Sequence, residues 1–419
     1  MPGRTSSIAL LVMLVTSCTW VSVDRRHGRD RLGGILVITL DTTRADRLTP
    51  YGYMSASMPH LERLAREGVV FDQAVSVAPL TLPAHCSLFT GHYPARHGVR
   101  HNASPALADT ATTLAELLGQ EGFRTAGFVG SVVLDPDRGL AQGFRTYAGV
   151  RDRSPRSSFG QRRADEVVDD AIRWLEDGDG RFFLWTHFYD PHRPYDPPAD
   201  FQSVSDPYVG EIVFVDSQIG RLMDALERLG VMRETLVVVV GDHGESLGEH
   251  GERDHGVLLY ESVLRVPLII RAPTFRPARA TAVVRLVDVM PTILDLAGVP
   301  APSLDGISLT GLMAGTRVDP DLEAHAESFD MSRAGYPQRR AMRHGRYKVI
   351  DGPRQELYDL ARDPFELRNL HDERQPLASA MIRRLRAVSG EAVRTPASDV
   401  PPDLRARLAA LGYLSPRQP

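Results

Sequence analysis

Short apolar runs separated by amphipathic segments constrain the fold of this chain more than any other feature. The runs at 35–40, 182–188 and 235–240 are largely apolar, which is typical of parallel strands buried on both faces. Segments such as 58–67 and 211–229 carry apolar residues at helical spacing between the runs. The alternation predicts an α/β fold with a doubly wound, mostly parallel sheet, in which ligands bind at the carboxyl ends of the strands.

The pattern changes at about residue 319, where the apolar segments become shorter. Segments such as 347–350 and 356–360 predict a small antiparallel sheet, and a helix is expected to cover it. The apolar face of that helix is predicted to consist of Leu377, Met381, Leu385 and Val388.

These patterns divide the chain into five predicted segments. They are a signal segment at 1–18, a linker at 19–33, a main α/β domain at 34–318, a C-terminal α+β subdomain at 319–394, and a linker with a terminal helix at 395–419.

The first 18 residues resemble the export signal of a bacterial lipoprotein. A short basic start precedes an apolar stretch at 8–15, which is much shorter than the ~20 residues of a membrane-spanning helix. The segment 15–18 (Val-Thr-Ser-Cys) is similar to a lipobox, so we expect cleavage before Cys18 and attachment of a lipid to it. The protein is therefore expected in the bacterial envelope or periplasm, held to the membrane through the lipid alone. Secretion without a lipid and a cytoplasmic location are the alternatives.

The other cysteine, Cys86, then has no intramolecular partner and is expected to be a buried free thiol.

The charge balance excludes one class of binding partner. Lys and Arg number 49 against 53 Asp and Glu, for a formal charge of −4, and no basic run with interleaved aromatic residues occurs. Nucleic acid is therefore not an expected partner. The oligomeric state is not indicated by any pattern.

Polar residues follow three of the apolar runs. Asp41 comes after the first run, the segment 187–192 after the second, and Asp242 and His243 after the third. Two carboxylates and an imidazole at one edge of a sheet predict a metal site, although each residue alone could instead cap the next helix. The Gly-rich loop that continues from His243 adds further histidines, among them His255.

The segment 78–91 carries a candidate nucleophile. Pro83 belongs in a first helical turn, which predicts Thr81 at the N-cap and His85 one turn later on the same face. The N-terminus of a helix favours an anion, and a nearby metal can lower the pKa of a hydroxyl. Thr81 is thus a candidate nucleophile toward a phosphoryl or sulfuryl centre, with a plain N-cap as the alternative.

At this point the chain resembles the sulfatase family of the alkaline phosphatase superfamily. The resemblance extends from residue 35 to 370 and follows the order of the family's motifs. The segments that carry it are 40–46 (Leu-Asp-Thr-Thr-Arg-Ala-Asp), 81–98, 190–195 (Asp-Pro-His-Arg-Pro-Tyr), 241–244 (Gly-Asp-His-Gly), 260–267, 288–292 and 356–370.

Two departures from the family pattern lie at the expected nucleophile. A typical sulfatase has Cys-x-Pro-Ser-Arg, whose Cys or Ser is oxidised to formylglycine. The resemblance places Thr81 at that residue and His85 at the Arg. Thr cannot be converted to the aldehyde. Cys86 lacks the Pro and the Arg that the modifying enzyme reads, so it is not expected to replace it.

Two more departures lie at the expected metal ligands. The chain has Asp41-Thr42 where sulfatases commonly have paired Asp, and Asp242-His243 where they have Asp-Asn. The resemblance therefore implies a divalent metal held by Asp41, Thr81, Asp242 and His243. The imidazole favours zinc or manganese over the calcium of an all-oxygen site.

Around this site the chain is similar to phosphonate monoester hydrolases and to lipid A phosphoethanolamine transferases. The latter carry a Thr nucleophile and a motif matched by 242–249 and by His255-Gly256, and their substrate-binding His is matched approximately by His192. The C-terminal motifs remain sulfatase-like.

The expected function is a metal-dependent hydrolase or transferase that acts on phosphate or sulfate esters, with phosphate favoured. Thr81 would be the nucleophile, while His85, His192 and His255 would bind the non-bridging oxygens, protonate the leaving group or recruit a second metal. The substrate would be a small-molecule, glycan or lipid ester. The alternatives are an arylsulfatase-like hydrolase working without formylglycine and a catalytically silent anion-binding protein.

Overall fold

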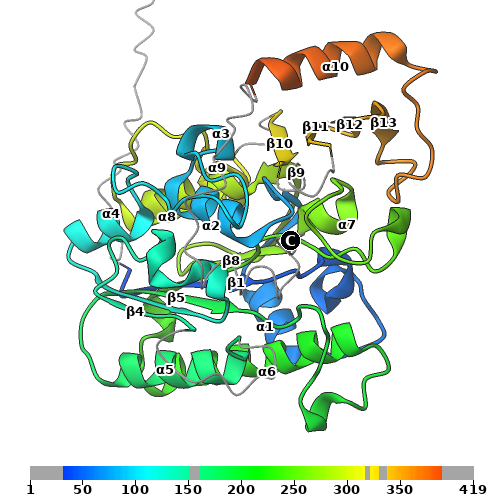
Figure 1. Cartoon of the computed structure of the whole chain (residues 1–419). Helices are drawn as coiled ribbons and strands as arrows, with labels where there is room; N and C mark the ends of the chain where they lie inside the picture. Colours follow the sequence, from blue (N-terminus) through cyan, green and yellow to red (C-terminus); the bar gives the residue numbers. More distant parts are fainter. Residues whose placement is uncertain (1–31, 151–160, 317–320, 330–336, 389–419) are drawn as a thin grey trace, which may run out of the picture. The chain divides into compact units, whose positions relative to one another are not determined.

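A nine-stranded mixed sheet with helices on both faces forms the larger part of the structure, and a four-stranded antiparallel sheet follows it in sequence (Figure 1). The computed structural model describes residues 32–150, 161–316, 321–329 and 337–388. The predictions for the signal segment with Cys18 and for the terminal helix lie outside these residues. The predicted fold class is confirmed.

The nine strands of the main sheet are joined mostly by parallel pairs around β1. In spatial order the strands are β4-β3-β5-β1-β6-β8-β2-β7, with β9 parallel to β2, and the antiparallel pairs are β6/β8, β2/β8 and β2/β7. The strands are β1 (Gly34–Leu40), β2 (Val69–Val75), β3 (Arg124–Val129), β4 (Thr146–Ala148), β5 (Phe182–Phe188), β6 (Thr235–Gly241), β7 (Arg265–Val266), β8 (Leu268–Arg271) and β9 (Ala278–Arg285).

Helices cover both faces of this sheet, and each layer has its own apolar core (Figure 1). One core joins the sheet to α1, α5 and α6, and the other joins it to α2, α4 and α8. The helices are α1 (Pro59–Glu67), α2 (Thr81–Thr90), α3 (Pro94–His97), α4 (Leu114–Gln120), α5 (Ala164–Glu176), α6 (Pro207–Arg228), α7 (Glu261–Leu264), α8 (Val289–Ala297), α9 (Thr310–Met313) and α10 (Gln375–Val388).

The second sheet packs on both of its faces. Its order is β10-β11-β12-β13, with strands β10 (Glu323–Ser328), β11 (Arg339–His344), β12 (Tyr347–Asp351) and β13 (Glu356–Asp359). One face contacts α10, and the other shares an apolar cluster with residues of β2, α7 and β9.

The predicted helix over the second sheet is present as α10, with one correction. Met381 and Leu385 are buried on its apolar face, whereas Val388, the last residue of the helix, is 57% exposed. Val388 lies at the C-terminal end of α10 and is not part of the apolar cluster between this helix and the sheet. Over the described part of the chain, no helix combines the length and apolar character needed to cross a membrane.

Candidate active site

Three neighbouring strands end at one edge of the main sheet and place polar residues there. The register of β1 with its two neighbours sets Leu40 opposite Phe188 and Gly241. Asp41 and Asp242 directly follow β1 and β6, so their backbones leave the sheet at the same level. The parallel strands thus bring the two carboxylates together, at the edge where ligands bind in doubly wound sheets.

Thr81 lies at the start of α2 and contacts this group. Its Oγ1 is 3.5 Å from Asp41 Oδ1 and 3.3 Å from His243 Nε2. The predicted N-cap position of Thr81 is wrong: Leu80 is the N-cap residue, its side chain makes no cap hydrogen bond, and Asn102 Oδ1 accepts from the Leu82 N–H at 2.9 Å. Pro83 is the third helical residue and has no N–H to be capped. The Thr81 hydroxyl is consequently directed into the site rather than to the backbone.

Asp41, Asp242 and His243 form a set whose donor atoms fit a divalent metal ion. One ligand atom from each residue lies within 4.8 Å of the others, and all three side chains are buried. Within the described residues, Oδ2 of both carboxylates has no hydrogen-bond partner. His243 Nδ1 is 2.9 Å from the Gly244 carbonyl, so Nδ1 donates and Nε2 keeps its lone pair for the carboxylate side.

The pKa values of this set follow from its burial and its charges. Burial, and then the charge of Asp41, raises the pKa of Asp242 well above its usual range. Burial opposes ionisation of Asp41 too, but His187 and the other nearby histidines outweigh it and lower its pKa. Burial and the charge of His255 lower the pKa of His243 to about 3. The imidazole is therefore neutral at physiological pH, as a metal ligand must be.

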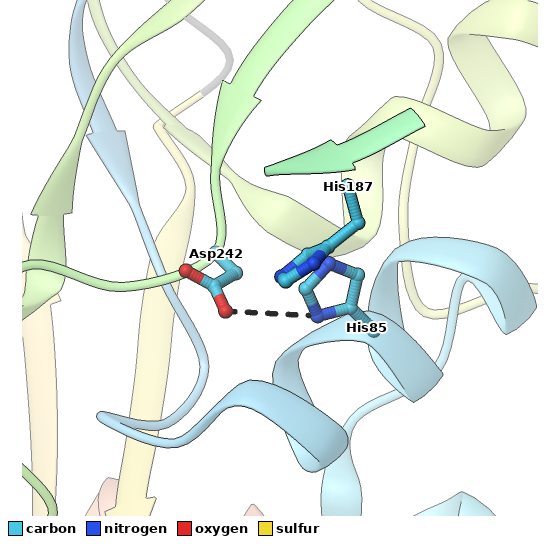
Figure 2. A group of neighbouring side chains, drawn as sticks. All are labelled: His85, His187 and Asp242. Atoms are coloured by element: carbon cyan, nitrogen blue, oxygen red, sulfur yellow. Dashed lines mark ion pairs between the residues drawn. The ribbon is translucent and has the colours of Figure 1, made fainter. Parts of the chain in front are cut away.

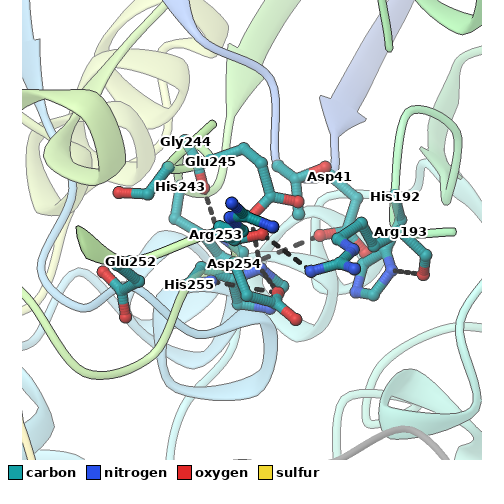
Figure 3. A network of polar contacts seen from close by, with 12 residues as sticks. Asp41, His192, Arg193, His243, Gly244, Glu245, Glu252, Arg253, Asp254 and His255 are labelled. Atoms are coloured by element: carbon teal, nitrogen blue, oxygen red, sulfur yellow. Dashed lines mark hydrogen bonds and ion pairs between the residues drawn. The ribbon is translucent and has the colours of Figure 1, made fainter. Parts of the chain in front are cut away.

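His255 is held beside this set by two carboxylates (Figure 3). Its Nδ1 is 3.1 Å from Glu245 Oε1 and 3.0 Å from Asp254 Oδ1, and Tyr195 donates a hydrogen bond to the other oxygen of Glu245 at 3.0 Å. Burial opposes the charged imidazole, but the two carboxylates raise the pKa of His255 well above its ordinary value. Its ring centroid is 4.5 Å from that of His243. A protonated imidazole therefore borders the candidate metal site.

His192 lies next to His255, with 5.1 Å between the ring centroids (Figure 3). Its ring stacks on Tyr189, whose hydroxyl is 2.8 Å from His192 Nδ1, and the same nitrogen is 2.6 Å from the Arg193 carbonyl. The stacking and the contacts at Nδ1 hold the ring in one orientation at the border of the site.

His85 follows Thr81 by one turn of α2. Its Nδ1 is 2.8 Å from the Thr81 carbonyl and 3.6 Å from Asp242 Oδ2. Figure 2 shows its ring next to His187, which comes from β5, with 5.0 Å between the ring centroids. The structure thus gathers all seven of the predicted site residues at one end of the main sheet.

Three further residues belong to this region and were not predicted as site residues from the sequence. They are His187, Glu245 and Asp254. His187 lies near the end of the apolar run 182–188, and Glu245 and Asp254 lie in the Gly-rich loop after His243, so their positions in the sequence indicated a place near the site. Their contacts, however, depend on how distant segments meet.

Thr42 stands where sulfatases have a second Asp, and it is directed away from the carboxylates. Its hydroxyl donates to the Pro191 carbonyl, and its φ is 49°. Thr42 therefore supplies no ligand atom to the candidate metal site.

Comparisons with known proteins identify the family of this chain. The sulfatase family model matches residues 34–299, and the model of the N-sulphoglucosamine sulphohydrolase C-terminal region matches residues 248–390. The ulvan-active sulfatase of Formosa agariphila is 27% identical over 397 residues, covering 80% of this chain and 76% of that protein. The choline-sulfatase of Rhizobium meliloti is 26% identical over 446 residues, covering 84% and 85%.

Two solved structures share the fold. The phosphonate monoester hydrolase of Agrobacterium radiobacter has a TM-score of 0.70 and 22% identity, covering 87% of this chain and all of that one. A protein solved with its substrate D-glucosamine-2-N,6-O-disulfate has a TM-score of 0.73 and 22% identity, covering 84% and 97%. The family model covers well over half of the chain. The chain belongs to the sulfatase family of hydrolases, within the alkaline phosphatase superfamily.

Proposed function

We propose that this protein is a metal-dependent hydrolase or transferase that acts on phosphate esters through the hydroxyl of Thr81. The observation that supports the proposal is the position of Thr81 Oγ1, 3.5 Å from Asp41 Oδ1 and 3.3 Å from His243 Nε2. A hydroxyl so close to a buried carboxylate and a neutral imidazole is suited to nucleophilic attack.

The proposed metal ligands are Asp41, Asp242, His243 and the Thr81 hydroxyl. A divalent ion bound by them would lower the pKa of that hydroxyl and offset the negative charge that develops on the substrate. The imidazole favours zinc or manganese over calcium.

In the proposed reaction, the deprotonated Thr81 oxygen forms a bond to phosphorus while the bond from phosphorus to the leaving oxygen breaks. The departing alkoxide takes a proton from His255, whose imidazolium is stabilised by Glu245 and Asp254. A water molecule or an acceptor alcohol then attacks phosphorus, and neutral His255 accepts its proton. The bond from phosphorus to Thr81 Oγ1 breaks, which restores the deprotonated Thr81 oxygen. His192 is proposed to bind a non-bridging oxygen.

The preference for phosphate follows from the single hydroxyl of threonine. As the family resemblance implies, hydrated formylglycine can expel sulfate by forming its aldehyde. A sulfated threonine has no second hydroxyl and could be released only by slow hydrolysis of an alkyl sulfate. A phosphorylated threonine beside a metal can be displaced at phosphorus.

The test is a comparison of substrates on one zinc-loaded preparation. We expect kcat/KM for an aryl phosphate or an aryl phosphodiester to exceed that for the matching aryl sulfate by at least about 100-fold, or roughly 2.7 kcal/mol in barrier. Intact-protein mass spectrometry after a brief substrate pulse should show one phosphoryl adduct on Thr81. A clear preference for the sulfate would contradict the proposal.

Hydrolysis of sulfate esters without formylglycine is the second candidate, because the curated relatives described above are sulfatases. Those relatives act on ulvan and choline sulfate by name, so a glycan or a small alcohol is the proposed esterified group in either case. The substrate comparison separates the two candidates, and turnover of neither ester would instead favour a silent anion-binding protein.

A further inference from the structure

The three residues His85, His187 and Asp242 form a second cluster of possible metal ligands, which shares Asp242 with the first (Figure 2). They come from α2, from β5 and from the residue after β6. One ligand atom from each lies within 4.8 Å of the others, and all three side chains are almost fully buried. No part of the proposed one-metal reaction uses His187.

Several polar atoms in this cluster lack the partners that buried atoms normally have. Across the described residues, Nε2 of His85, Nε2 of His187 and Oδ2 of Asp242 form no hydrogen bonds. Leaving a buried polar atom unpaired is unfavourable. The three residues that carry these atoms are neighbours, which indicates that a group not made of protein side chains binds among them.

The other nitrogen of His85 has a partner that suits metal binding. Nδ1 lies 2.8 Å from the Thr81 carbonyl, so Nδ1 carries the proton and Nε2 carries a lone pair. Donation from one imidazole nitrogen to a backbone carbonyl is the common arrangement in histidines that bind metals through the other nitrogen.

His187 is directed toward the same cluster. The Gly130 N–H donates to the His187 carbonyl at 3.1 Å and to His187 Nδ1 at 3.4 Å. Nε2 is the His187 nitrogen on the side of the carboxylates. His187 Nε2 is 3.5 Å from Oδ2 of Asp41, which also has no hydrogen-bond partner among the described residues. Asp41 therefore presents Oδ1 to Thr81 and Oδ2 to His187.

The charges in this region also favour a cation. Two carboxylates, Asp41 and Asp242, are buried within one site, and their ion-pair contacts in the described structure come from histidines alone. Imidazoles compensate a buried carboxylate fully only when they are protonated. A divalent cation would compensate both carboxylates without requiring protonated imidazoles.

We propose that His85, His187 and Asp242 bind a second divalent metal ion beside the one proposed at Asp41, Asp242 and His243. Asp242 belongs to both sets and bridges the two ions, and Asp41 Oδ2 lies at the border of the second set. Two nitrogen ligands again favour zinc or manganese. The site rests on the proposed first metal, and together the two sets of ligands would form a binuclear centre.

The test is metal stoichiometry on purified protein loaded with excess manganese and then freed of unbound metal. We expect about two manganese ions per wild-type chain by elemental analysis and about one in His187→Asn and in His85→Gln. His243→Ala should also retain about one ion, bound at the second set. His325→Gln, a partly buried histidine outside both clusters, is the matched control and should retain two.

Electron paramagnetic resonance supplies a readout that does not depend on activity. Two Mn²⁺ ions about 4 Å apart are magnetically coupled, and the coupled spectrum should disappear in His187→Asn while a single-ion spectrum remains. Circular dichroism checks that each variant is folded. A histidine that only orients Asp41 would leave one ion in the wild type and in His187→Asn, and that result would overturn the second site. The phosphate and sulfate assay tests the proposed function separately, because it asks which ester reacts rather than how many ions bind.

Discussion

Thr81 is the residue on which the proposed chemistry depends. It is completely buried, its hydroxyl contacts Asp41 and His243, and it caps no helix. Its side chain therefore contributes to the site more than to the stability of α2.

We expect Thr81→Ala to lower kcat by at least about 1000-fold, because the nucleophile is removed. The melting temperature should change little, since one hydroxyl that makes no cap bond stabilises the fold by about 1 kcal/mol or less. Steady-state kinetics on an aryl phosphate and thermal unfolding measure the two effects.

The matched control is Thr90→Ala, in the same helix, where the hydroxyl bonds only to the Cys86 carbonyl. This variant should retain activity. If Thr81→Ala remained within a few-fold of the wild type, Thr81 would not be the nucleophile.

At the scale of elements, two buried acidic residues lie where α6 meets the segment after β5. They are Glu211 in α6 and Asp190. Glu211 Oε1 accepts a hydrogen bond from the Asp196 N–H at 2.9 Å, while no described group hydrogen-bonds to its Oε2. Burial, followed by the charge of Asp190, raises the pKa of Glu211 to about 9. The folded protein therefore keeps a proton that the unfolded chain loses near pH 4.5.

This raised pKa predicts a loss of stability as the pH rises from about 5 to 9, because the folded state binds more protons there than the unfolded state. Glu211→Gln cannot ionise, so its free energy of unfolding should fall less over that range, by about 1 kcal/mol or more. Urea unfolding at pH 5, 7 and 9 measures the difference. Asp224→Asn, at an exposed position of the same helix, is the control. Parallel pH profiles for Glu211→Gln and the wild type would refute the prediction.

The second sheet is joined to the main one by buried charges as well as by apolar packing. Lys348 in β12 is 1% exposed and lies 3.1 Å from Glu261 Oε1 in α7 and 2.9 Å from Glu366 Oε1. Arg343 in β11 adds a contact to Glu261 at 2.9 Å. These pairs fix the antiparallel sheet against α7, the helix that follows the loop with His255.

At the scale of the whole molecule, the proposed attachment to a membrane depends on one residue. Cys18 follows an apolar stretch in a lipobox-like sequence, and we propose that it carries a lipid after cleavage. Over the described residues, no helix offers a membrane span as a substitute.

We expect Cys18→Ser to release the protein from the membrane fraction of the producing cells, while the activity per molecule stays unchanged. Fractionation with immunoblotting and mass spectrometry of the mature N-terminus measure this. Cys86→Ser, a buried cysteine in α2, is the control and should leave the location unchanged. A wild-type protein that is already in the soluble fraction and begins elsewhere than residue 18 would contradict the proposal.

Local sequence patterns determined the central strands, the site candidates and the family of this protein. Apolar runs predicted β1, β5 and β6 to within one residue, because a strand buried on both faces must be apolar throughout. The residues that follow those strands were predictable as site candidates, because parallel strands end at a common edge. The family, too, could be identified from the order of its motifs.

Only the tertiary structure decided which of these side chains lie close enough to contact one another or to bind the same ion. His187 lies in a buried strand, and its sequence neighbours do not show that it lies 3.5 Å from Asp41. The grouping of Glu245 and Asp254 on one nitrogen of His255 likewise depends on how their loop folds back. Such contacts join segments far apart in the chain or depend on the path of an irregular loop, and periodicity carries information only about neighbours within one element.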